Sequence, residues 1–138
     1  MQNSDPFKSY TQIAAQTAPG VLIQMLFDRG VRALEEALAG FECDDPRQKN
    51  ETIHNNLRRA VDIVRLLKNS LNLEEGGELA QTLQNLYSYF EEHLVRSNMQ
   101  KSRDGIDEVL RHLRPLRDSW TEMLSKRGQE QEKELEVA

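Results

Sequence analysis

The closest match to a metal-binding pattern in this sequence is Glu51-Thr-Ile-His54, a carboxylate and an imidazole three residues apart. On a helix this spacing places both side chains on one face. Two such motifs and two further carboxylates build the di-iron centre of some four-helix bundles. A second motif is missing, because Glu108 and His112 are four residues apart. We therefore predict no metal site and no cofactor.

The three histidines, His54, His93 and His112, raise the possibility of phosphotransfer, which some four-helix bundles perform on an exposed histidine. Such a histidine typically has lysine at the third position after it and glycine at the fourth, and none of the three does. Gly76 and Gly77 lack the following Lys-Ser/Thr of a phosphate-binding loop, so we interpret them as a helix-breaking turn. No residue set points to catalysis, and we predict that the protein is not an enzyme.

The charge balance argues against nucleic acid as a partner. The formal net charge is −5 at pH 7, whereas phosphate backbones bind basic surfaces. The basic stripe Arg111, Arg114 and Arg117 is interleaved with Glu108 and Asp118. This pattern is typical of a solvated, ion-paired helix face.

Nothing in the sequence directs the chain out of the cytoplasm. The N-terminus, MQNSDPFKSY, is polar and has no hydrophobic signal-peptide region. No apolar run approaches the ~18 residues that a membrane span needs. The single cysteine, Cys43, cannot form an internal disulfide. We expect a cytoplasmic protein that does not insert into membranes.

The hydrophobic periodicity is helical almost throughout the chain. Asp45 followed by Pro46 marks a helix start, and Gly76-Gly77 marks a break. We predict four long helices, near residues 18–41, 46–71, 77–98 and 103–127. Their short connections make consecutive helices antiparallel neighbours. The predicted fold class is all-α, an antiparallel up-and-down four-helix bundle.

Two shorter stretches flank these helices. Residues 1–16 begin a short helical segment at Asp5-Pro6 that is too short to be stable alone. Its apolar face consists of Phe7, Tyr10 and Ile13. Residues 128–138, GQEQEKELEVA, read as a charged, disordered tail, with an extension of the last helix or a secondary contact as the alternatives. We predict a single domain over residues 1–127.

The first long helix carries more apolar surface than a corner helix of a bundle needs. Its apolar residues fill an arc of about 180° when placed at ~100° per residue. The N-terminal segment could cover the surplus as part of the core. It could also be a removable lid over a groove for an amphipathic partner helix. The arc includes Ile23, Phe27, Val31, Leu34 and Leu38.

The order of several motifs resembles the flagellin export chaperone family FliS. Residues 69–80 (NSLNLEEGGELA) and 86–89 (LYSY) are similar to that family's SLD-x-E-x-GGE-A and LY-x-Y patterns. Upstream, residues 22–28 (LIQMLFD) are similar to its LI-x-MLYDG. Downstream, residues 113–120 (LRPLRDSW) are similar to its LR-xx-W. The resemblance covers about residues 7–124.

The resemblance implies a cytoplasmic chaperone without enzymatic activity that binds the disordered C-terminal region of flagellin. Binding would prevent premature polymerisation and deliver flagellin to the flagellar type III export apparatus. The export gate and a further flagellar regulator are additional candidate partners. The alternative is a structural or regulatory bundle that associates with itself. Candidate client-binding residues are Phe7, Tyr10, Ile13, Ile23, Phe27, Val31, Leu34, Leu38, Leu66 and Tyr87.

Overall fold

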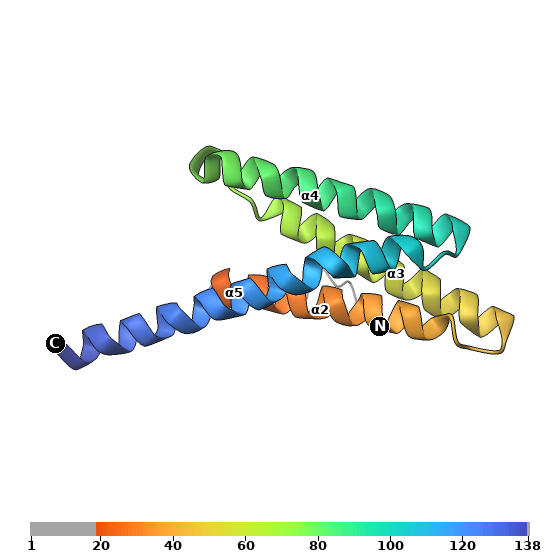
Figure 1. Cartoon of the computed structure of the whole chain (residues 1–138), viewed down its shortest axis with the longest axis horizontal. Coiled ribbons are helices and arrows are strands. Elements are labelled where there is room, and N and C mark those ends of the chain that lie inside the picture. Colours follow the sequence, from red (N-terminus) through yellow and green to blue (C-terminus); the bar gives the residue numbers. More distant parts are fainter. Residues whose placement is uncertain (1–18, 138) are drawn as a thin grey trace, which may run out of the picture.

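The structure, a computed structural model, describes residues 19–137, which form four helices and no strand. The helices are α2 (Pro19–Gly40), α3 (Pro46–Asn69), α4 (Leu73–Gln100) and α5 (Asp104–Val137). Each helix packs against the next, and α5 packs against α2, so the four close a ring (Figure 1). The predicted four-helix bundle is confirmed. The predicted N-terminal helical segment lies outside the described residues.

The start of α3 follows directly from local sequence chemistry. The Asp45 side chain accepts a hydrogen bond from the Arg47 backbone N–H at 3.1 Å. Pro46 occupies the first helical position, where its missing N–H costs nothing. This is the start that the Asp-Pro pair predicted.

The start of α4 differs from the prediction, because the helix begins before the glycine pair. The Asn72 side chain accepts from the Glu75 N–H at 3.1 Å and caps a first helical turn over residues 73–76. Gly77 then takes φ 55° and ψ −132°, a conformation that only glycine adopts readily. The glycine break therefore lies inside α4 and separates its first turn from the rest of the helix.

The residues beyond Gly128 are helical and extend α5 to Val137. The prediction of a disordered tail is therefore not met, and the alternative, an extension of the last helix, is what the structure has. Every residue from 125 to 136 is exposed, so the extension is solvated as expected. Glutamate, glutamine and lysine are good helix formers. A single glycine costs only about 1 kcal/mol relative to alanine, which is too little to end the helix.

At one end of the bundle, residues 41–45 connect α2 to α3 and residues 101–103 connect α4 to α5. We call this the closed end. Complete burial of one leucine, isoleucine, valine or phenylalanine side chain stabilises the fold by roughly 1.5–3 kcal/mol. Fully buried core residues include Leu34, Ile53, Leu57, Phe90, Leu94, Ile106, Val109 and Leu113.

Candidate functional site

Burial along the apolar stripe of α4 falls from one end of the helix to the other. Leu94 and Phe90 are fully buried, Leu86 and Leu83 are half-buried, and Leu79 is 69% exposed. These residues lie three or four positions apart, so they share one face of the helix. The helices that cover this face at the closed end therefore cease to cover it toward the start of α4. We call this second end of the bundle the open end.

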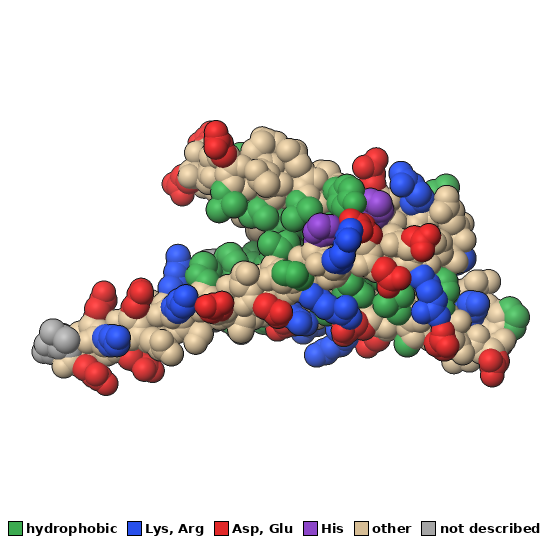
Figure 2. Space-filling view, in the orientation of Figure 1, with side chains coloured by type: hydrophobic (Ala, Val, Ile, Leu, Met, Phe, Trp, Pro, Cys, Tyr) green, Lys and Arg blue, Asp and Glu red, His purple; other side chains and the backbone are tan. Residues whose placement is uncertain are grey.

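The apolar stripe of α5 shows the same change in the opposite chain direction. Val109 and Leu113 are fully buried, whereas Leu116, Trp120 and Leu124 are half-buried. Figure 1 shows α4 and α5 diverging toward the open end. In Figure 2 the space between them is a hollow with hydrophobic side chains along it. We call this hollow, between the first half of α4 and the middle of α5 (residues 116–124), the open groove.

Contacts between α5 and α2 show that α4 is the helix that diverges. The Trp120 indole N–H donates to the Gly20 carbonyl oxygen at 2.8 Å. The Trp120 ring also packs against Phe27, with 6.2 Å between ring centroids. A Cβ atom on Gly20 would lie 2.8 Å from Leu124 Cδ2, so the start of α2 and this part of α5 are closely packed. The part of α5 around Trp120 and Leu124 is thus fixed to α2.

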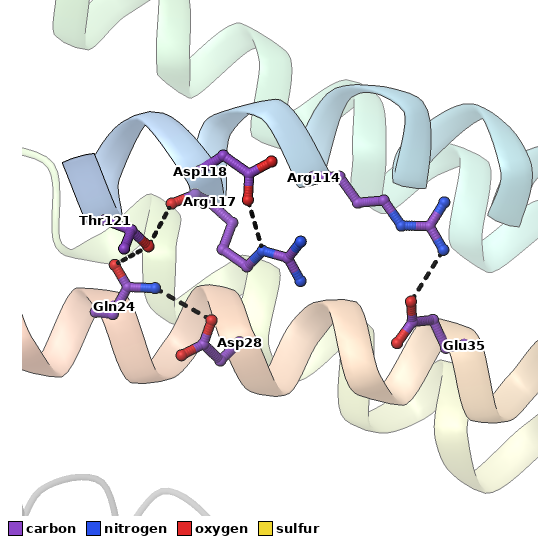
Figure 3. Close-up of polar contacts among 7 residues, drawn as sticks. All are labelled: Gln24, Asp28, Glu35, Arg114, Arg117, Asp118 and Thr121. Atoms are coloured by element: carbon purple, nitrogen blue, oxygen red, sulfur yellow. Dashed lines mark hydrogen bonds and ion pairs between the residues drawn. The ribbon is translucent and has the colours of Figure 1, made fainter.

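Polar side chains reinforce the pairing of α2 and α5 along its solvent side (Figure 3). The Thr121 hydroxyl lies 2.8 Å from Gln24 Oε1, and Gln24 Nε2 donates to Asp28 at 3.1 Å. Arg114 donates to Glu35 at 3.0 Å. Such exposed contacts contribute about 0–1 kcal/mol each, so they align the two helices more than they stabilise the fold.

The basic stripe along α5 is ion-paired. In addition to the Arg114–Glu35 pair, Arg117 contacts Asp118 at 3.1 Å and Arg111 contacts Glu108. Since each arginine has a carboxylate partner, the stripe is a solvated, neutralised helix face, as its charge pattern predicted.

A different polar contact joins α4 to α5 near the closed end. The Tyr89 hydroxyl donates to Glu108 Oε2 at 2.7 Å, and His112 Nε2 lies 3.1 Å from the same oxygen. Hydrogen bonds from Tyr89 and then His112 lower the pKa of Glu108 to about 2. The hydrogen bond to Glu108 in turn raises the pKa of Tyr89. Glu108 is therefore a carboxylate acceptor at neutral pH.

The predicted client-binding residues fall into three groups. Ile23, Leu38 and Leu66 are half-buried, and Leu38 lies near the closed end, away from the groove. The buried residues are Phe27, Val31, Leu34 and Tyr87, each at most 3% exposed. Phe7, Tyr10 and Ile13 lie outside the described residues.

The three members of this group on α2, Phe27, Val31 and Leu34, are buried because α3 and α5 cover the apolar arc of α2 from both sides. Sequence reasoning did not select Leu79 or Leu83 as surface residues. Their periodicity matches that of the buried part of α4, and periodicity carries no information about where a neighbouring helix ends.

The two polar residues of the Glu51-Thr-Ile-His54 motif have separate partners in the structure. His54 Nδ1 lies 2.9 Å from the Asn98 amide nitrogen, while Glu51 pairs with Arg47 at 3.3 Å. Within residues 19–137, no three His, Cys, Asp and Glu side chains are grouped as a metal ion would require. Over the same stretch, no helix combines the length and the apolar character that crossing a membrane demands.

A four-helix bundle with an exposed apolar groove at one end is an architecture suited to binding an amphipathic helix. The chain belongs to the family described as flagellar protein FliS, whose family model matches residues 2–127. This is a family of flagellar secretion chaperones.

Three relatives show how far the similarity extends, and each is named flagellar secretion chaperone FliS. The Salmonella typhimurium protein is 32% identical over 91% of this chain and 95% of its own length. The Bacillus subtilis protein is 30% identical over 90% of each chain. The Campylobacter jejuni protein is 30% identical over 89% of this chain and 94% of its own.

Proposed function

We propose that this protein is a cytoplasmic, non-enzymatic export chaperone that binds the C-terminal region of flagellin in the open groove. The observation that carries the groove's role is the loss of burial along α4, from fully buried Leu94 to 69% exposed Leu79. A soluble protein has little reason to expose the inward face of a bundle helix unless a partner covers it.

The physical chemistry of the groove suits a client that folds on binding. A disordered, amphipathic segment cannot bury its apolar side chains alone and gains that burial in an apolar groove. Leu79 and Leu83 on one wall, with Leu116 and Trp120 on the other, offer exposed or half-buried surface for it. An amphipathic helix of flagellin would then cover the apolar side chains that α4 and α5 leave exposed in the groove.

We infer that residues 1–16 act as a lid on this groove. The segment joins the bundle at the start of α2, where Gly20 contacts Trp120 and Leu124 beside the groove. Its apolar residues Phe7, Tyr10 and Ile13 would occupy the groove in the free protein and move aside for flagellin. Such competition lowers the apparent affinity in proportion to the closed population.

The consequences for flagellin follow from covering its C-terminal region. A covered region cannot join other subunits, so polymerisation in the cytoplasm would be prevented. The complex could then be handed to the flagellar type III export apparatus, with the export gate and a further flagellar regulator as additional partners.

The test is to mix the full-length protein with purified flagellin and, separately, with flagellin that lacks its C-terminal region. Light scattering after size exclusion should show a complex with intact flagellin only, and that complex should not elongate flagellin seeds. Equal binding of both flagellins would contradict the proposed site. Self-association without any flagellin complex would favour the alternative, a self-associating bundle.

A further inference from the structure

The two walls of the open groove approach each other most closely at the closed end of the bundle. A Cβ atom on Gly105 would overlap the Ser97 hydroxyl and the His93 carbonyl oxygen, so the first turn of α5 lies directly against the α4 backbone. Ser97 is 2% exposed, which shows how tightly this point is packed. Because the two helices are in closest contact here, we expect any change in the angle between α4 and α5 to pivot at this point, which we call the fulcrum.

Tyr89 forms a second tie between the same two helices, on the groove side of that fulcrum. Its hydroxyl donates to Glu108 Oε2 at 2.7 Å, the only side-chain hydrogen bond between α4 and α5 in the part of the chain that the structure describes. Its ring meets His93 edge-on, with 4.2 Å between centroids, and His112 at 6.2 Å. Tyr89 thus contacts both helices through its ring and its hydroxyl.

The acceptor of this hydrogen bond is itself held in place. His112 Nε2 lies 3.1 Å from the same Glu108 oxygen, and Arg111 donates to the other carboxylate oxygen. Both partners belong to α5, so they orient the carboxylate toward α4 without adding a second link between the helices. The side-chain hydrogen bond between α4 and α5 therefore depends on the Tyr89 hydroxyl, while the ring contacts with His112 add packing only.

Divergence of the helices begins just beyond this tie. Phe90 is fully buried, but Leu86, one turn nearer the open end, is half-buried, and Leu79 is 69% exposed. Leu79 is ten residues from Tyr89, which is about 15 Å along a helix. A rotation of ~10° at Tyr89 would therefore move Leu79 by roughly 3 Å, enough to lose contact with an occupant of the groove.

We propose that Tyr89 is a positioning residue: its hydrogen bond to Glu108 sets the angle between α4 and α5 and hence the width of the open groove. This inference rests on the proposed function only for the effect on flagellin binding. The effect on helix spacing is independent of it. Fixing the groove before the client arrives reduces the entropy lost on binding.

Four variants test the tie. Tyr89→Phe removes only the hydroxyl, and Glu108→Ala removes the acceptor. Glu108→Gln keeps an acceptor oxygen and is the conservative rescue. Arg65→Met is the matched control, because it breaks an exposed ion pair of 3.1 Å between α3 and Glu91, on the other side of α4. Thermal unfolding first establishes that each variant is folded.

The readout is the distance between α4 and α5 at the open end, measured by electron double resonance. Spin labels are attached at Thr82→Cys and Ser125→Cys, both exposed, in a chain with Cys43→Ser. Tyr89→Phe and Glu108→Ala should broaden and shift the distance distribution, while Glu108→Gln and Arg65→Met should reproduce the wild-type one. Unchanged distributions in Tyr89→Phe would overturn the proposal.

Binding of the flagellin C-terminal region gives the second readout. Tyr89→Phe should weaken it roughly three- to tenfold, with Glu108→Gln close to wild type. If Tyr89→Phe shifts the distance between α4 and α5 but the wild-type protein binds no flagellin, the proposed function is refuted. The positioning role of Tyr89 would then still stand. If Tyr89→Phe binds flagellin with wild-type affinity and keeps the wild-type distance between α4 and α5, the positioning role of Tyr89 is refuted. Flagellin binding in the open groove would then still stand.

Discussion

The indole N–H of Trp120 donates to the carbonyl oxygen of Gly20 at 2.8 Å, across 100 positions of the chain. The bond joins the first turn of α2 to the middle of α5, on the wall of the open groove that does not diverge. Trp120 is half-buried, so it packs against the core while part of the residue remains accessible to solvent.

Truncation of Trp120 should therefore destabilise the fold by less than truncation of a fully buried tryptophan. We expect Trp120→Ala to cost about 2–4 kcal/mol, at or below the ~3–5 kcal/mol of a buried site. Trp120→Phe should cost about 1 kcal/mol through the lost hydrogen bond. Urea unfolding measures both, and an unchanged midpoint for Trp120→Ala would show that α5 is not fixed to α2 in this way.

Two glycines of α5 should respond to alanine in opposite directions. Gly105→Ala places a methyl group against Ser97 and the His93 carbonyl oxygen, so we expect a loss of about 1–3 kcal/mol from overpacking. Gly128→Ala meets open space on an exposed helix and should raise helix content. Circular dichroism during urea unfolding measures both. A drop in helix signal for Gly128→Ala would argue against a helical extension.

The carboxyl of Glu108 should make a stability contribution that depends on pH. Its pKa is lowered from 4.5 to about 2, mainly by the hydrogen bond from Tyr89. The unfolded chain then takes up this proton first, so the contribution is present above about pH 4.5 and declines as pH falls toward 2. The stability difference between wild type and Glu108→Gln should shrink over that range. A difference that stays constant from pH 7 to 3 would contradict the lowered pKa.

Deletion of residues 1–15 tests whether the N-terminal segment is a lid. We expect the bundle to remain folded, to bind more hydrophobic dye and to bind flagellin as well as or better than the full chain, because the competing segment is gone. Loss of flagellin binding by a folded deletion variant would show that the segment is a binding element. Unfolding on deletion would show that it belongs to the core.

The sequence predicted the helices better than it predicted the surface between them. The Asp45-Pro46 pair fixed the start of α3, because capping and proline placement are local effects. By contrast, Leu79 and Leu94 occupy equivalent positions on one stripe, yet one is 69% exposed and the other is fully buried. That difference depends on where the neighbouring helices end and how far they diverge, which no local pattern encodes.

The wide apolar arc of α2 is a second case in which the sequence pattern did not predict which residues are exposed. Its width predicted surplus surface, but Val31 and Leu34 are buried because two neighbouring helices share that arc. The groove lies instead where α4 separates from α5. Charged residues after Gly128 likewise gave no hydrophobic periodicity from which a helix could be predicted, although their helix propensities are favourable.

The most direct test of the open groove compares two exposed apolar residues of α4. Leu79 faces the groove and is 69% exposed, while Met99 is 81% exposed near the closed end, outside the groove. Because neither is buried, Leu79→Glu and Met99→Glu should both unfold at the wild-type midpoint. Calorimetric titration with the flagellin C-terminal region should show at least tenfold weaker binding for Leu79→Glu, which would bury a charge, and wild-type binding for Met99→Glu. Equal affinities for the two variants would contradict the assignment of flagellin to this groove.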